Sequence, residues 1–194
     1  MELGDSELLA RYRDGDSASM EVLVWRYKRQ LFAFILNMTG NGVEADDVFQ
    51  DVWLKAIKKL DSYREGSFLG WLTRIAHNTV VDRWRARKPA VSLDEDEGEG
   101  KEVARALADV SQGPDRQAEA ADLKKKVERA LSMLPLEQRE VVVMRIKTGL
   151  SFKEIAKAQG VSINTALARM QYGLSKLKRT LASERSPVAG ENET

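Results

Sequence analysis

Residues 151–178, SFKEIAKAQGVSINTALARMQYGLSKLK, predict two helices joined by a tight turn. Ser151 and Glu154 have the spacing of a capping box, in which a serine and a glutamate side chain each satisfy a free backbone amide at the start of a helix. Gly160 then ends the first, short helix, and Ser162 is placed to cap the longer helix that follows. Two helices in this order, separated by a glycine turn, form the helix-turn-helix arrangement.

The second of these helices has an apolar stripe and a polar outer face. The stripe consists of Ala166, Met170, Gly173, Leu177 and Leu181. The outward or flanking positions are Asn164, Thr165, Ala168, Arg169, Gln171, Tyr172 and Lys176. Asn, Gln and Arg can pair with base edges, whereas Lys and Thr usually contact phosphates. The alternative is a helical hairpin whose outer face is merely solvated, because sequences that look like a helix-turn-helix are common.

The N-terminal part of the chain predicts further amphipathic helices. From residue 5 to about residue 88, apolar residues recur at spacings of three and four, and the strict alternation of a β-strand is absent. Turn-forming residues at 14–16, 40–42 and 62–67 divide this part into four helices. We therefore expect an all-α fold.

A change of composition separates two domains. Residues 90–117 are rich in Asp, Glu, Gly and Ser, which bury too little apolar area to offset the entropy lost on ordering. Helical periodicity returns near residue 118. We predict a helical domain at 1–89, a flexible acidic linker at 90–117, a second helical domain at 118–183 and a frayed tail at 184–194.

The net charge of +1 hides strong charge patterning. Residues 71–88 and 169–180 are basic, and the acidic segment 94–102 lies between them. On a helical projection at about 100° per residue, one side of the first basic segment collects Arg74, His77, Asn78, Arg85 and Lys88. Such a face, with Trp84 interleaved, suits phosphate neutralisation and stacking on unpaired bases. The alternative is the solvated end of an ordinary surface helix.

The third predicted helix, residues 44 to about 60, carries an acidic and amide patch. It consists of Asp47, Gln50, Asp51 and Leu54, and lies away from the apolar stripe of that helix. The patch would repel DNA and suits a protein partner that bears arginines. A metal site formed by Asp46, Asp47 and Asp51 is the alternative, but adjacent carboxylates at helical spacing are more often a solvated face.

Several classes of protein have little support. The chain has no cysteine, and His77 is its one histidine, so a thiolate zinc site is excluded and a histidine-based triad would depend on that residue. A glycine-rich phosphate loop and a nucleophile elbow are absent. We expect neither an enzyme nor a cofactor nor a metal. No apolar run reaches the roughly 20 residues that span a bilayer, and the acidic start is not a secretion signal, so we expect a cytoplasmic protein without membrane insertion.

Motifs in both helical domains resemble one known family. Region two of bacterial sigma factors of the extracytoplasmic-function (ECF) type is similar to residues 47–53 (DVFQDVW), 68–72 (FLGWL), 75–78 (IAHN) and 82–85 (DRWR). Region four of that family is similar to residues 134–135 (LP), 138–139 (QR) and 150–178. The resemblance is specific because these motifs occur in this order on both sides of a variable linker. This sequence differs from the family at Leu167, Tyr172 and Leu174, where relatives often carry basic residues.

The resemblance implies a transcription initiation factor with several partners. Core RNA polymerase, through its largest subunits, would bind Asp47, Gln50, Asp51 and Leu54. The minus-ten element of melted promoter DNA would bind Tyr63, Arg64, Ser67, Phe68, Arg74, His77, Asn78, Arg85 and Lys88. The minus-thirty-five element would bind the outward positions of residues 163–178 given above, together with Ser162. Relatives are commonly held inactive by an anti-sigma factor, so such a partner is expected here. The alternatives are a stand-alone helix-turn-helix regulator, which would not need polymerase, and an enzyme acting on nucleic acid.

Overall fold

The computed structural model describes residues 3–64, 66–87 and 114–183, and all regular elements in these ranges are helical. Their order is α1 (Asp5–Arg13), α2 (Ser17–Thr39), α3 (Gly42–Lys58), a 3-10 turn η1 (Leu60–Ser62), α4 (Phe68–Arg87), α5 (Pro114–Ser132), α6 (Leu136–Val143), a π-helical turn η2 (Met144–Thr148), α7 (Phe152–Gln159) and α8 (Ile163–Ser183). The predicted all-α class is confirmed. Lys88, the acidic linker up to residue 113 and the predicted tail lie outside the described residues.

Helices α1 to α4 form a first module around one apolar core. Leu23, Phe34, Val48 and Leu72 are fully buried in it, and α2, α3 and α4 pack against one another. The break predicted at residues 40–42 is present, because Gly40 ends α2 with a φ of 69° and the next helix starts two residues later. A left-handed backbone of this kind is readily adopted by glycine.

Two helix boundaries differ from those predicted. The third helix ends at Lys58, and a 3-10 turn over Leu60–Ser62 follows where the helix was expected to continue. Helix α5 begins at Pro114, inside the segment predicted as linker. An amide in the first turn of a helix has no carbonyl acceptor within the helix, so proline, which lacks the amide hydrogen, loses no hydrogen bond there.

Helices α5 to α8 form a second module that contains the predicted helix-turn-helix. The capping box is present: the Ser151 hydroxyl accepts a hydrogen bond from the Glu154 amide at 3.3 Å, and the Glu154 carboxylate accepts one from the Ser151 amide at 2.7 Å. Gly160 has a φ of 68°, and the Ser162 hydroxyl accepts a hydrogen bond from the amide of Thr165 at 3.0 Å. The turn chemistry read from the sequence is therefore confirmed. The π-helical turn η2 was not predicted.

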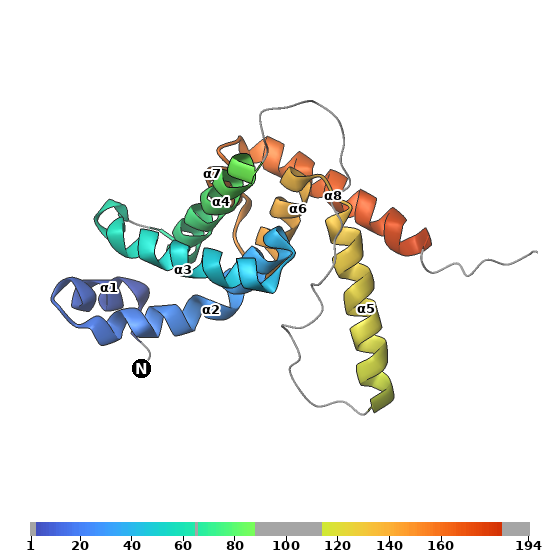
Figure 1. The fold of residues 1–194 in the computed structure, drawn as a ribbon. Coiled ribbons are helices and arrows are strands. Elements are labelled where there is room, and N and C mark those ends of the chain that lie inside the picture. Colours follow the sequence, from blue (N-terminus) through green and yellow to red (C-terminus); the bar gives the residue numbers. More distant parts are fainter. Residues whose placement is uncertain (1–2, 65, 88–113, 184–194) are drawn as a thin grey trace, which may run out of the picture.

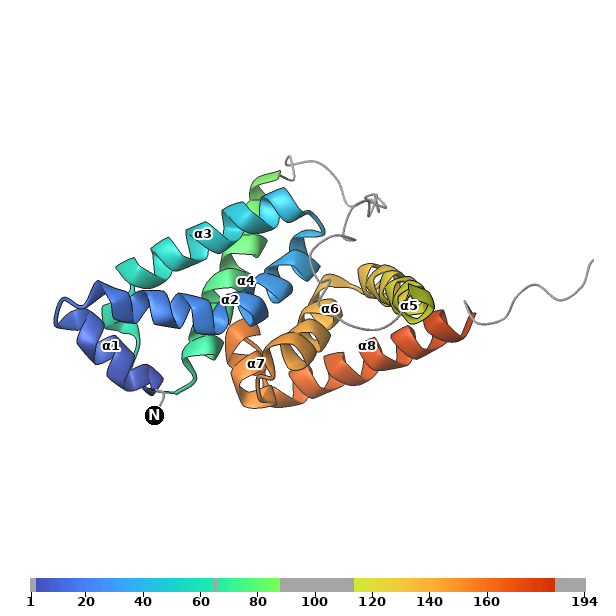
Figure 2. The ribbon, with the colours of Figure 1, turned by 90° about the horizontal axis from the view of Figure 1, so that it is seen from below.

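The two modules lie against each other. Helix α7 packs on α4, and η2 and α6 pack on α2, so α6, η2 and α7 cover one side of the first module (Figure 1). The view from below shows α4 between α3 and the α6–α7 pair, whereas α5 and the C-terminal part of α8 extend away from the first module (Figure 2). This contact between the modules was not predicted from the sequence.

Candidate nucleic-acid interface

The outer side of α3 presents most of the predicted acidic and amide patch. Asp47 and Gln50 are exposed, and Leu54 lies beside them with 57% of its surface exposed. Two further apolar side chains on the same side, Val43 and Ile57, are also exposed. We call these five residues the α3 face. It combines negative charge with uncovered apolar surface, and the sequence analysis missed its two additional apolar members.

Asp51 behaves differently from the rest of the predicted patch. It is half-buried, and its carboxylate accepts a 2.5 Å hydrogen bond from the Arg83 guanidinium of α4. Asp51 therefore joins α3 to α4 in addition to lying at the edge of the α3 face. Sequence periodicity places Asp51 on a face of its own helix but does not show which neighbouring helix supplies a partner.

Part of the predicted basic face of α4 is exposed to solvent, and part of it is turned toward the second module. Arg74, Asn78 and Arg85 are exposed along one side. His77 is instead turned toward the second module, where its Nδ1 atom lies 2.8 Å from Oε1 of Glu140 on α6. Only part of the predicted minus-ten face is therefore open to solvent in this arrangement.

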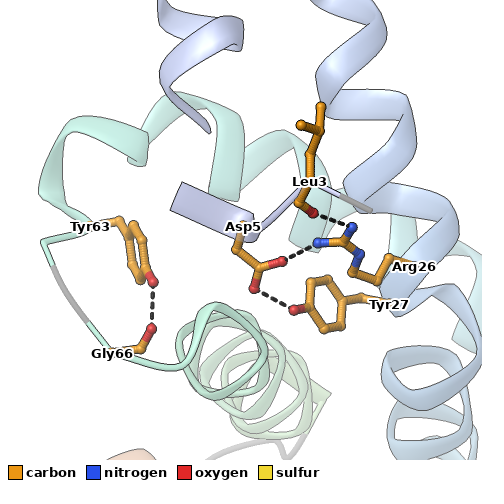
Figure 3. Close-up of polar contacts among 6 residues, drawn as sticks. All are labelled: Leu3, Asp5, Arg26, Tyr27, Tyr63 and Gly66. Carbon is orange, nitrogen blue, oxygen red and sulfur yellow. Dashed lines mark hydrogen bonds and ion pairs between the residues drawn. The ribbon is translucent and has the colours of Figure 1, made fainter. Parts of the chain in front are cut away.

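The loop before α4 is supported by an aromatic cluster. The Tyr63 ring packs against the rings of Phe68 and Trp71, with centroid distances of 5.3 Å and 5.4 Å. Its hydroxyl donates a 2.6 Å hydrogen bond to the carbonyl of Gly66 (Figure 3). Phe68 is 1% exposed, so it supports the loop from within the core. Unlike Tyr63, Arg64 and Ser67, the other predicted minus-ten residues of the loop, Phe68 does not reach solvent.

The exposed part of the loop is polar. Arg64 and Ser67 are both exposed, and the Ser67 hydroxyl accepts a 3.0 Å hydrogen bond from the amide of Gly70 in the first turn of α4. Tyr63 is half-buried, and burial raises its pKa, with a further contribution from the charge of Asp5. The loop therefore presents a neutral phenol, a guanidinium and a hydroxyl next to the basic side of α4.

A polar cluster connects the start of α1 to α2 and, through Tyr27, to the aromatic residue Phe68. The Arg26 guanidinium donates to the Asp5 carboxylate at 2.6 Å and to the carbonyl of Leu3 at 2.7 Å, and the Tyr27 hydroxyl donates to the other oxygen of Asp5 (Figure 3). Burial raises the pKa of Tyr27, and the hydrogen bond to Asp5 raises it further. The Tyr27 ring packs on Phe68 at 5.9 Å. Asp5 was not singled out from the sequence, because its partners lie more than 20 residues away.

Helix α8 presents the predicted minus-thirty-five residues to different extents. The exposed ones are Ser162, Asn164, Thr165, Gln171 and Tyr172, and the half-buried ones are Ala168, Arg169 and Lys176. The Arg169 guanidinium donates a 3.0 Å hydrogen bond to the side-chain oxygen of Gln159 on α7. The N-terminal half of α8 thus offers amide, hydroxyl and aromatic groups to solvent, with its arginine held by the preceding helix.

Comparisons with known proteins identify the family. Residues 23–89 match the family described as Sigma-70 region 2, and residues 124–177 match Sigma-70, region 4. The chain is 31% identical to the ECF RNA polymerase sigma-E factor of Escherichia coli strain K12 over 173 residues, which are 87% of this chain and 90% of that protein. The chain belongs to the ECF sigma factors. This sigma factor is also 29% identical to the RNA polymerase sigma-H factor of Pseudomonas aeruginosa, over 86% of this chain and 88% of that protein.

A solved structure has the same fold. CnrH, solved in complex with the cytosolic domain of CnrY, superposes with a TM-score of 0.68 and 25% identity, covering 93% of this chain and 98% of that one. The resemblance read from the motifs is therefore confirmed, and with it the function of an alternative sigma factor in transcription initiation. These matches do not favour a stand-alone regulator, because both modules match regions of a sigma factor in the family's order.

Two further observations concern membranes and metals. Across residues 3–64, 66–87 and 114–183, no helix is long and apolar enough to cross a membrane. In the same part of the chain, no group of three or more His, Asp or Glu side chains is arranged to hold a metal ion.

Proposed function

We propose that this sigma factor acts through three separate surfaces. The α3 face binds the largest subunits of core RNA polymerase, the loop before α4 and the exposed side of α4 bind the opened minus-ten element, and the N-terminal half of α8 enters the major groove at the minus-thirty-five element. The protein directs polymerase to promoters in the cytoplasm and performs no catalysis of its own.

The chemistry of the α3 face supports polymerase docking. Asp47 repels DNA phosphates and attracts a basic protein surface, which favours the correct partner over nucleic acid. Leu54, with Val43 and Ile57 beside it, supplies the uncovered apolar area that a protein interface buries at its centre. Gln50 adds an amide that can donate and accept hydrogen bonds.

The chemistry of the loop and α4 supports binding of an opened strand. Arg64, Arg74 and Arg85 are exposed guanidiniums that can neutralise phosphates of one strand. Extruding a base from the duplex costs a few kcal/mol, so a site that captures it must supply stacking and hydrogen bonds in return. The ring of Tyr63 and the hydroxyl of Ser67 offer these contacts, and the aromatic cluster beneath the loop holds them in place.

A solved structure of a sigma factor suggests a third partner besides core polymerase and promoter DNA. The sigma factor RpoE from Bartonella quintana was solved in complex with the anti-sigma factor NepR. We propose that an anti-sigma protein also binds this chain and competes with polymerase, because the α3 face and α8 both expose apolar side chains such as Leu54, Leu167 and Leu174.

The observation that carries the proposal is the presence on one chain of an acidic and apolar face on α3, a basic side on α4 and a helix-turn-helix. Run-off transcription with purified core polymerase on a library of upstream regions tests it. Specific start sites that appear only with this protein are expected, and they would also give the promoter sequence. Tight DNA binding without any affinity for core polymerase would instead favour a stand-alone regulator.

A further inference from the structure

The last turn of α1 is hydrogen-bonded to the segment that leads into the loop before α4. The Arg13 guanidinium donates a 3.3 Å hydrogen bond to the carbonyl of Leu60 in η1. The same carbonyl accepts a 3.0 Å hydrogen bond from the amide of Tyr63. Arg13 therefore helps to fix the backbone oxygen from which the Tyr63 end of the loop is held.

The first turn of α1 is connected to the same loop through aromatic rings. The Asp5 carboxylate accepts a hydrogen bond from the Tyr27 hydroxyl (Figure 3), and the Tyr27 ring packs on Phe68 at a centroid distance of 5.9 Å. Phe68 is buried and packs in turn against the Tyr63 ring at 5.3 Å. Because protein interiors are close-packed, a ring that moves displaces its neighbours. The place of the Tyr63 ring therefore depends on the Tyr27 ring and, through it, on Asp5.

The electrostatics place the Asp5 carboxylate close to both phenols. Burial raises the pKa of Tyr63, and the negative charge of Asp5 raises it further. Burial also raises the pKa of Tyr27, with a further contribution from the hydrogen bond to Asp5. Since the interaction between two charges weakens with distance, an effect of Asp5 on Tyr63 indicates that the start of α1 lies near the loop.

Apolar contacts hold α1 in the core independently of Asp5. Leu8 and Leu9, near the middle of the helix, are 2% and 1% exposed. The Asp5 and Arg26 side chains keep 25% and 26% of their surface exposed. Burial of two leucine side chains continues to dock the helix when the charge of Asp5 is removed. We therefore expect variants that neutralise this charge to remain folded.

We propose that α1 braces the loop before α4, and that Asp5 and Arg13 are positioning residues for the capture of a minus-ten base. Neither side chain contacts DNA itself. Asp5 fixes the Tyr63 ring through the aromatic contacts, and Arg13 fixes the backbone at Leu60. A site that already has its binding geometry loses less entropy when its ligand arrives. This inference rests on the proposed function, because it takes the loop to be the site of the minus-ten element.

Amide hydrogen exchange at Tyr63 tests the brace in the absence of DNA. Asp5→Asn leaves one oxygen acceptor where the carboxylate has two, Tyr27→Phe removes only the hydroxyl, and Arg13→Ala removes the contact at the other end of α1. Glu7→Gln is the matched control, because it neutralises an exposed carboxylate on the same helix. We expect exchange about tenfold faster in the first three variants and unchanged in the control, since loss of the brace lowers the free energy of local opening.

Exchange at a core amide separates a brace from a general loss of stability. Val52 of α3 is fully buried and reports opening of the whole module. Its exchange should change much less than that of Tyr63. Unchanged exchange at Tyr63 in all three variants, or an equal increase at Tyr63 and Val52, would overturn the brace.

Binding of single-stranded DNA by the holoenzyme tests base capture. The probes are a fluorescent oligonucleotide with the minus-ten element of a promoter found by run-off transcription, and a series that lacks one base at a time. The unaltered protein should lose affinity most sharply when one particular base is removed. Asp5→Asn should bind the intact strand about fivefold more weakly, but should match the unaltered protein on the strand without that base, because the two changes remove the same interaction.

Two results of the binding measurement would overturn the positioning role. One is a loss in Asp5→Asn that is equal on every oligonucleotide, as a purely structural role predicts. The other is full affinity of Asp5→Asn for the intact strand. Failure of the proposed function would show differently, as run-off transcription without specific start sites, and the exchange measurement would still report on the brace.

Discussion

Arg83 of α4 donates a 2.5 Å hydrogen bond to the carboxylate of Asp51 on α3, and so joins the helix of the α3 face to the helix with the basic side. The Arg83 and Asp51 side chains keep 29% and 41% of their surface exposed. Solvent therefore screens the pair, and its contribution to stability is about 0.2–1 kcal/mol.

The first prediction concerns this pair. Asp51→Ala and Arg83→Ala should each lower the free energy of unfolding by up to about 1 kcal/mol, and the double variant should lose less than the sum. Denaturant unfolding of the four proteins measures the coupling. Strictly additive losses would mean that the two side chains do not interact in solution.

The second prediction concerns polymerase docking. Gln50→Ala combined with Asp47→Arg should weaken binding to core polymerase about tenfold or more, corresponding to about 1.4 kcal/mol, because it removes an amide and reverses a charge on the α3 face. The circular dichroism spectrum should be unchanged, since both side chains are exposed. Asp61→Arg, an equal charge reversal on η1, is the control. Unchanged affinity in the double variant would remove the α3 face from the interface.

The third prediction concerns the packing of α8 on α6. A Cβ atom at Gly173 would lie 3.0 Å from a methyl group of Val142, so Gly173→Ala should destabilise the second module by about 1–3 kcal/mol. Gly42→Ala at the start of α3 is the matched control, because a Cβ atom there meets nothing within 4 Å. Thermal unfolding compares the two. Similar melting temperatures would show that the two helices can move apart at little cost.

The fourth prediction concerns the N-terminal cluster. Asp5→Ala should cost about 1–3 kcal/mol, because it removes the carboxylate that accepts hydrogen bonds from the part-buried Arg26 and Tyr27. Glu7→Ala, which breaks only an exposed pair with Arg11 one turn away, should cost about 0.3–0.5 kcal/mol. Chemical denaturation provides the comparison. If the two losses were the same, Asp5 would not anchor α1.

The fifth prediction concerns readout by α8. In the holoenzyme, Arg169→Ala should weaken binding to duplex DNA containing the minus-thirty-five element by about 1–3 kcal/mol if the guanidinium reaches a base edge. Competition with altered duplexes distinguishes the kind of contact. A loss that is equal for every sequence would assign Arg169 to a phosphate instead.

Local features of this protein were determined by the sequence alone. The capping box at Ser151, the turn at Gly160 and the breaks near Gly40 depend on residues within a few positions of each other, so their chemistry is readable without a fold. The exposure of Gln50 and Leu54 followed from helical periodicity in the same way. The order of the motifs then sufficed to identify the family.

The tertiary structure decided which side chains meet across helices. Asp51 was predicted as a polymerase contact, and the fold adds Arg83 as its partner within the protein. Phe68 was predicted as a minus-ten contact, and the fold buries its ring against that of Tyr63. Helical periodicity places His77 on the basic face of its helix. Only the packing of the second module brings Glu140 to 2.8 Å from it. Periodicity fixes the direction of a side chain on its own helix, whereas its partner depends on how distant helices pack, which no local pattern encodes.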